Sequence, residues 1–115
     1  MTSVTLTNLV AERVMGWSVG PDRFMMGNRR WIPAWRFQPT ERIEDAFRVL
    51  DAADPDEYRI DSCRGGSFTV KVRIAGGVGE ASEMEKARAI THAVARAIGL
   101  EPEGGNEQRF RTERP

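Results

Sequence analysis

Hydrophobic residues recur every three or four positions in three parts of the chain, a spacing typical of amphipathic helices. It predicts helices over about residues 5–16, 40–53 and 82–98. Thr40 is the expected N-cap of the second helix, because its hydroxyl can accept a hydrogen bond from the first helical turn. Ser82 and Glu85 have the S-x-x-E spacing of a capping box, which predicts that the third helix begins at Ser82.

A pattern with period two predicts a β-hairpin between the second and third helices. Apolar and polar residues alternate over residues 58–63 and again over residues 68–74, as they do in strands with one face on a core. Gly65 and Gly66 lie between the two runs and suit a tight turn.

Residues 76–79, with the sequence Gly-Gly-Val-Gly, are expected to form a flexible link between the hairpin and the third helix. Phosphate-binding loops often occupy such a position between a strand and a helix. This segment matches neither G-x-x-x-x-G-K-[ST] nor G-x-G-x-x-G. The carboxylates of Glu80, Glu83 and Glu85 would also repel a phosphate, so the flexible link is the favoured interpretation.

Between the first two helices, residues 18–39 are punctuated by glycine and proline and are expected to form a loop with room for one short strand. The segment is rich in large apolar side chains, namely Phe24, Met25, Met26, Trp31, Ile32, Trp35 and Phe37. Because exposing so much apolar area is unfavourable, we expect this loop to pack against the rest of the domain.

The order of these elements predicts an α+β fold, with one small β-sheet layered with three helices in the manner of an α-β-α sandwich. A single domain is expected over residues 1–100. Residues 101–115 contain little apolar area besides Phe110 and are expected to form a disordered or frayed tail.

Composition narrows the classes of function. The 115-residue chain is 40% hydrophobic and has a formal net charge of zero, so a broad nucleic-acid surface is not expected, although a local basic patch is compatible. One cysteine, Cys63, and one histidine, His92, are too few for an internal disulfide or a usual zinc site. No stretch suits a signal peptide or a membrane span. We therefore expect a cytoplasmic protein without cofactor or metal and, since no nucleophile has a base near it in sequence, not an enzyme.

The sharpest candidate binding site combines arginine with tryptophan: Arg29, Arg30, Trp31, Trp35 and Arg36. An indole can stack on a base while guanidinium groups pair with phosphate, so this set favours a nucleotide or single-stranded nucleic acid. In the alternative, the tryptophans are core residues under a long loop and the arginines are solvated beside them. Buried aromatics are the commoner arrangement, and the sequence alone leaves both interpretations open.

A second candidate site is the row Arg88, His92 and Arg96, spaced i, i+4, i+8 on the third predicted helix. Such a row would suit an acidic partner or phosphates. The favoured alternative is an ordinary solvated helix face. Ala89 and Ala93 flank the row, and residues this small would let another helix approach as the seam of a homodimer.

The segment Leu9–Trp17, LVAERVMGW, resembles the opening of the phage ABA-sandwich domain family. The remainder of the chain is similar to the family in order: a tryptophan-containing stretch, Pro39-Thr40 before a helix, a strand pair, and a last helix with KARAITHAV at Lys86–Val94. The glycine-rich link and the charged tail depart from the family pattern. The resemblance implies a compact α-β-α unit encoded by a phage or prophage, and it carries over no catalytic residue.

Two hypotheses of function are open at this point. The first is a phage or prophage accessory protein that binds and blocks a host protein, for example a defence component such as a CRISPR effector. This hypothesis rests on the class of protein that the chain resembles and not on particular residues. The second is a module that binds a nucleotide or signalling nucleotide through the arginine and tryptophan residues between positions 29 and 36. A host protein is the expected partner, a nucleotide ligand and a homodimer are the further expectations, and no membrane partner is expected.

Overall fold

The computed structural model describes residues 2–102, so the predicted tail lies, from residue 103 onward, outside the described residues. Within them the chain forms three α-helices and two antiparallel sheets of three strands each, which confirms an α+β fold. The elements, in chain order, are α1 Ser3–Arg13, β1 Ser18–Val19, β2 Arg23–Met25, β3 Trp31–Pro33, the 3-10 helix η1 Ala34–Arg36, α2 Ile43–Ala53, β4 Glu57–Ser62, β5 Phe68–Ile74, β6 Gly77–Glu83 and α3 Lys86–Ala97.

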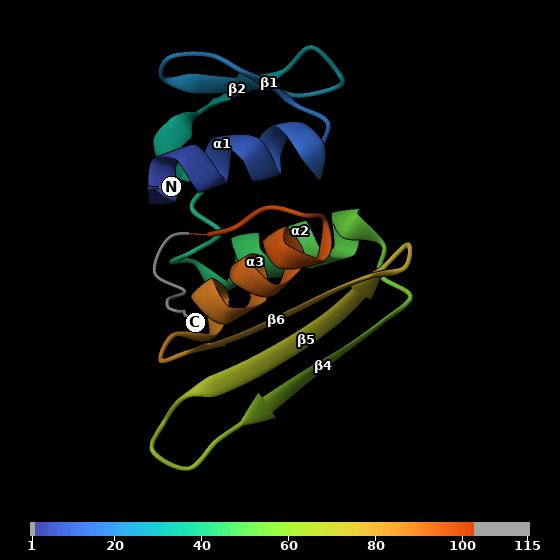
Figure 1. Cartoon of the computed structure of the whole chain (residues 1–115). Helices are drawn as coiled ribbons and strands as arrows, with labels where there is room; N and C mark the ends of the chain where they lie inside the picture. The colour runs from blue at the N-terminus through green and yellow to red at the C-terminus, as the bar shows by residue number, and fades with distance from the viewer. Residues whose placement is uncertain (1, 103–115) are drawn as a thin grey trace, which may run out of the picture.

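The elements are stacked in layers (Figure 1). The first sheet, β1–β3, lies against α1 at one end of the molecule, α2 and α3 form the middle layer, and the second sheet, β4–β6, covers the other end. The apolar faces of all these layers join in one buried cluster that extends from Leu6 on α1 to Val72 on β5. The helices are thus shared between two sheets, where the sequence predicted one.

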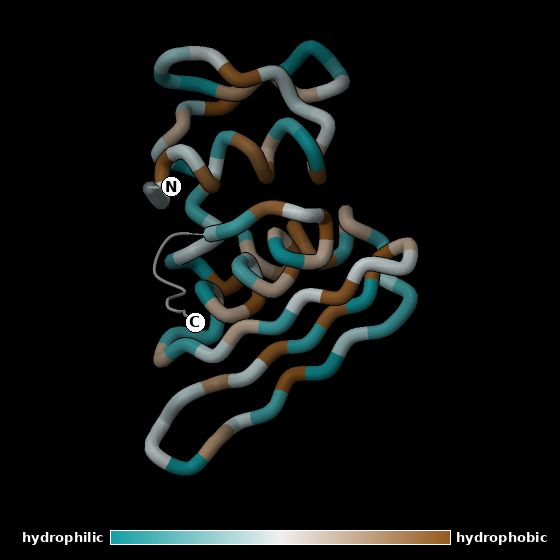
Figure 2. The backbone as a smooth tube through the Cα atoms, viewed as in Figure 1, coloured by the Kyte–Doolittle hydropathy of each residue, from teal (hydrophilic) through white to brown (hydrophobic). Residues whose placement is uncertain are grey.

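The second sheet follows directly from the period-two pattern, and the predicted hairpin is confirmed. Tyr58 pairs with Val72, and Ile60 pairs with Val70, in an unbroken antiparallel register. Along β5, hydrophobic and hydrophilic residues alternate (Figure 2). Val70 and Val72 are fully buried against the helix layer, while Lys71 between them is exposed.

The predictions of a flexible link at residues 76–79 and of a capping box at Ser82 are wrong. Residues 77–83 form β6, which pairs with β5 along its whole length. The Ser82 hydroxyl shares a 2.8 Å hydrogen bond with the Thr69 hydroxyl on the neighbouring strand. Helix α3 begins at Lys86, and Glu85 takes the N-cap position without a side-chain cap bond. The S-x-x-E spacing occurs here across the end of a strand, because pairing with β5 satisfies the main chain before the helix begins.

The glycines of β6 allow α3 to lie directly on the sheet. A Cβ atom at Gly79 would overlap the carbonyl oxygen of Ala93, and one at Gly77 would overlap that of Ala97. Glycine is therefore required at both positions by the close approach of two backbones. The same residues that suggested flexibility in the sequence are the closest point of contact between helix and strand.

The second helix begins later than expected. Helix α2 starts at Ile43 with Arg42 at the N-cap, while Thr40 is buried before it and is not the cap, contrary to the prediction. Asp45 in the first turn accepts a 2.9 Å hydrogen bond from the Gln38 backbone N–H. The Thr91 hydroxyl of α3 donates a buried 2.6 Å hydrogen bond to the Pro39 carbonyl. These two bonds hold the chain between η1 and α2 in place.

The segment expected as a loop with one strand instead forms β1, β2, β3 and η1. Its core is a cluster of three aromatic rings, Trp17, Phe24 and Phe37, with centroids 4.9–5.9 Å apart in tilted and edge-to-face geometry. Leu6 and Val10 of α1 are buried in the same core. The expectation that this segment packs on the domain is confirmed, but glycine and proline here separate short strands within a sheet.

Candidate functional site

The tryptophans of the Arg/Trp set lie on the surface. Trp31 on β3 is 51% exposed and Trp35 on η1 is 66% exposed, so the interpretation of both as core residues is wrong. The buried aromatic positions are taken by Trp17, Phe24 and Phe37. The sequence does not separate the two groups, because four of the five aromatics lie in the same irregular segment and Trp17 directly precedes it.

Arg30, Trp31 and Arg36 come together in one pocket of about 280 Å³. Met26 and Ile32 supply its apolar lining, and a fourth polar side chain, Arg48, reaches it from α2. Sequence reasoning missed Arg48, since it lies in a different segment; its only signal is an exposed position on a helix whose opposite face is apolar. Three guanidinium groups and one indole thus share a small cavity between the first sheet and α2.

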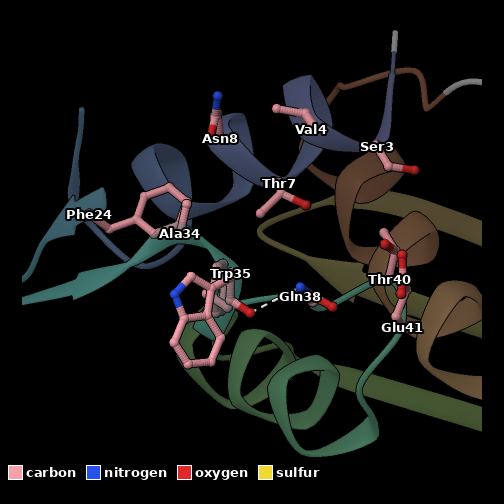
Figure 3. A pocket seen from close by; sticks show the side chains of 11 residues that line it. Ser3, Val4, Thr7, Asn8, Phe24, Ala34, Trp35, Gln38, Thr40 and Glu41 are labelled. Carbon is pink, nitrogen blue, oxygen red and sulfur yellow. Dashed lines mark hydrogen bonds between the residues drawn. The ribbon is translucent and has the colours of Figure 1, made fainter. Parts of the chain in front are cut away.

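Trp35 lines a different pocket, of about 250 Å³, together with side chains of α1 such as Val4 and Thr7 (Figure 3). The Gln38 side-chain amide donates a 2.9 Å hydrogen bond to the Trp35 carbonyl, which holds η1 at the rim (Figure 3). Arg29 lines neither of these two pockets and has a left-handed φ of 67° in the β2–β3 turn. The five predicted residues are therefore distributed over two pockets and a turn.

Positive charge is concentrated on this part of the chain. Between residues 18 and 37 there are four arginines and one acid, Asp22, a net charge of +3 in a chain that is neutral overall. Arg23 lies beside Asp22 and, by a hydrogen bond and its charge, lowers the pKa of that exposed carboxyl. The Arg23 guanidinium also lies 4.4 Å from the centre of the Trp31 ring, and that of Arg36 lies 6.0 Å from the Trp35 ring. Each exposed indole is thus paired with a cation.

The second candidate row does not form a solvated face, because the structure buries its middle member. His92 is only 3% exposed, whereas Arg88 and Arg96 are half-buried. The Nδ1 atom of His92 lies 3.5 Å from Oε2 of Glu83 and has no hydrogen-bond partner among the described residues. Burial, with smaller contributions from Arg96 and Arg88, lowers the pKa of His92 to about 4, so the imidazole is neutral at pH 7.

The other features of α3 are also structural. Ala89 and Ala93 are fully buried in the core, so the proposed homodimer seam between helices is wrong. Arg96 donates a 2.8 Å hydrogen bond from Nη1 to the Glu80 carbonyl of β6.

Within residues 2–102, no group of three or more histidine, cysteine or acidic side chains is placed to hold a metal ion.

Comparison with known proteins places the fold. Residues 8–97 match the family model of the phage ABA sandwich domain. A phage protein from Bacillus cereus ATCC 14579, known from its crystal structure, has a similar fold with a TM-score of 0.74 and 18% sequence identity, covering 90% of this chain and 93% of its own. No curated protein matches the chain. Over the described residues, none of the helices has the length and apolar character that crossing a bilayer requires.

Proposed function

The chain belongs to the phage ABA sandwich domain family, and from this premise we propose that it acts without catalysis, by binding a host protein that has an acidic surface. The binding region is the first-sheet surface, which we define as Met25, Arg30, Trp31, Trp35 and Arg36. The observation that carries the proposal is that two tryptophans in this surface are more than half exposed beside arginines.

Large apolar side chains gather on this surface. Met25 is 41% exposed and lies directly opposite Trp31 in the antiparallel register of β2 and β3. Tryptophan, arginine and methionine are enriched at protein–protein interfaces, where they supply most of the binding energy, and exposed apolar patches commonly mark such sites. The local charge of +3 adds a preference for an acidic partner.

Membership of a phage family favours a host protein as this partner. A phage protein of this size acts most simply by covering a functional surface of its target. The form of the proposal that we carry forward is inhibition of a host defence component, such as a CRISPR effector, in the cytoplasm of the infected bacterium.

The test is protection of a phage in bacteria that carry a defined defence system. The chain, produced from a plasmid, is expected to raise the efficiency of plating, and the double variant Trp31→Ala/Trp35→Ala is expected to lose this effect while remaining folded. Met84→Ala is the matched control, because Met84 is also 66% exposed but lies outside the first-sheet surface. Equal protection by the double variant would refute the assigned surface, and no protection against any defence system tested would refute inhibition.

A second candidate function is supported by the pocket of Arg30, Trp31, Arg36 and Arg48. Its volume of about 280 Å³ suits a small ligand or part of one, and three guanidinium groups can neutralise phosphate while the indole stacks on a base. These features favour a nucleotide or signalling nucleotide as the ligand.

Thermal unfolding with mono-, cyclic and dinucleotides tests this candidate. A ligand present at about 100 times its Kd would stabilise the folded state by about 2.7 kcal/mol, which is a clear rise in Tm. Arg48→Gln is expected to abolish the rise, whereas Arg64→Gln, an exposed position in the remote β4–β5 turn, retains it. No rise with any nucleotide would remove this candidate and leave protein binding untouched.

A further inference from the structure

Strand β4 forms the outer edge of the second sheet. It pairs with β5 on one side, and no strand of residues 2–102 pairs with it on the other (Figure 1). The strand is six residues long, contains no proline, and keeps a regular register with β5 from Glu57 to Ser62. A regular edge of this length is a template for pairing with another strand, and proteins that avoid such pairing usually interrupt it.

The hydrogen bonds of the hairpin show which main-chain groups point outward. The Cys63 N–H donates a 2.8 Å bond to the Ser67 carbonyl, so this end of the ladder is a hydrogen-bonded pair. Bonding alternates along an antiparallel pair. The main-chain groups of Tyr58, Ile60 and Ser62 therefore face away from β5, at the free edge.

We propose that β4 pairs antiparallel with β4 of a second copy of this chain, about a two-fold axis through Ile60, and joins two three-stranded sheets into one of six strands. In this register Ile60 lies opposite Ile60 of the other copy and Tyr58 lies opposite Ser62. All three residues present their main-chain groups outward, so the hydrogen-bonding requirement of a symmetric pair is met on both sides.

Side-chain charge selects this register. Arg59 lies opposite Asp61 of the other copy, and the symmetry produces the pair twice, at non-hydrogen-bonded positions where side chains approach most closely. Moving the strands by two residues would instead place Arg59 opposite Arg59, which is unfavourable. Within one chain Arg59 and Asp61 already form an exposed ion pair, with Nε and Oδ2 3.2 Å apart, so the two pairs would form a four-charge cluster.

The partial exposure of apolar side chains on β4 also supports pairing at this edge. Tyr58 belongs to the face that packs on the helices, since it pairs with fully buried Val72, yet it is 52% exposed. Ile60 on the same face is only half-buried. Helix α3 packs on β6 and β5 and leaves β4 less covered. A second copy, continuing the sheet with its helices on the same side, would cover both side chains.

The first experiment measures self-association and tests whether the charges on β4 control it. Sedimentation equilibrium of the full chain is expected to show a monomer–dimer equilibrium. Asp61→Arg and Arg59→Asp should each weaken the dimer about tenfold or more, because each places like charges opposite one another at two symmetric positions. The double variant Arg59→Asp/Asp61→Arg should restore it. Glu12→Arg, an exposed charge reversal on α1, is the matched control and leaves the dimer unchanged.

Hydrogen exchange identifies the edge involved. The amides of Tyr58, Ile60 and Ser62 are expected to become protected as the chain concentration rises through the dimerisation range. A chain that stays monomeric at high concentration overturns the proposal, and so does a dimer in which these amides remain unprotected. Failure here leaves the proposed function intact, because the first-sheet surface lies at the opposite end of the molecule (Figure 1).

Discussion

The first sheet, β1–β3, and the second sheet, β4–β6, differ in strand length and in what covers them. Strands of the first sheet have two or three residues, and Phe24 is their only buried residue. Strands β5 and β6 have seven residues each, and fully buried Val70 and Val72 face the helix layer. The short sheet exposes tryptophan and methionine, while the long sheet exposes mainly charged side chains on its open face.

Under the proposed function, this difference assigns stability mainly to the second sheet and binding to the first. The second sheet and α3 are joined by backbone contact at two glycines, an arrangement that tolerates almost no change. The first sheet is held by three aromatic rings, and its outer side chains are exposed to solvent. We therefore expect substitutions in the second-sheet region to affect folding, and substitutions on the first-sheet surface to affect binding.

The largest effect is expected at Gly79. Gly79→Ala places a Cβ atom into the backbone of α3, so the free energy of unfolding should fall by more than about 4 kcal/mol, or folding should be lost. Gly27→Ala, in the β2–β3 turn with open space around it, is the control and should change stability by less than about 0.5 kcal/mol. Urea unfolding measures both, and equal midpoints would contradict the close helix–strand contact.

The next largest effect concerns the aromatic cluster of the first-sheet region. Phe37→Ala removes a ring that contacts both Trp17 and Phe24, and it should cost about 3–5 kcal/mol. Hydrogen exchange of this variant should show loss of protection in β2 and β3 before β5. Uniform loss of protection across both sheets would show that the two regions unfold as one unit.

A smaller effect is expected from pH, through His92. The pKa of His92 in the folded chain is about 4, below its ordinary value of 6.5, so between these values the unfolded chain binds a proton that the folded chain does not. The free energy of unfolding should therefore fall as pH falls from about 6.5 to 4. Over this pH range the loss is expected to be about 2–3 kcal/mol.

His92→Gln provides the comparison for this pH dependence. Other carboxyl groups titrate in the same range in both proteins, so the difference between the two unfolding curves isolates the histidine. If the variant loses stability as steeply as the unchanged chain between pH 6.5 and pH 4.5, burial of His92 is not the cause.

The smallest effect on stability is expected on the first-sheet surface. Trp35→Ala removes a side chain that is 66% exposed, so the free energy of unfolding should change by less than about 0.5 kcal/mol. Chemical unfolding of this variant checks the prediction. A loss above 1 kcal/mol would indicate that Trp35 supports the fold, and it would remove the distinction between the two sheets.

Sequence patterns predicted the regular elements better than their boundaries. The predictions of three helices and a hairpin are confirmed. Each rests on the spacing of apolar residues within one segment, which reflects the local backbone conformation. The predicted start of α3 is wrong because glycine at positions 77 and 79 suggests a flexible link, whereas both residues are extended and paired with β5. Their role depends on a helix that comes later in the chain, and no local pattern reports such a contact.

The candidate site divides in the same way. The sequence predicts Arg30, Trp31 and Arg36 as members of one candidate site, since they are close together along the chain. Only the tertiary structure added Arg48, which a separate helix brings to the same pocket. Only the structure showed that His92 is buried, because β6, β5 and α2 all pack on α3 and cover part of its polar side as well as its apolar stripe.

Spacing and composition along the chain are enough to predict the three helical segments, the hairpin and the concentration of arginine and tryptophan before α2, because these features are local. Folding in three dimensions establishes which aromatic rings are buried, which residues share a pocket and which strands lie at the edges of a sheet. These properties arise from contacts between distant segments, where side-chain volume and backbone approach, rather than local preference, determine the arrangement.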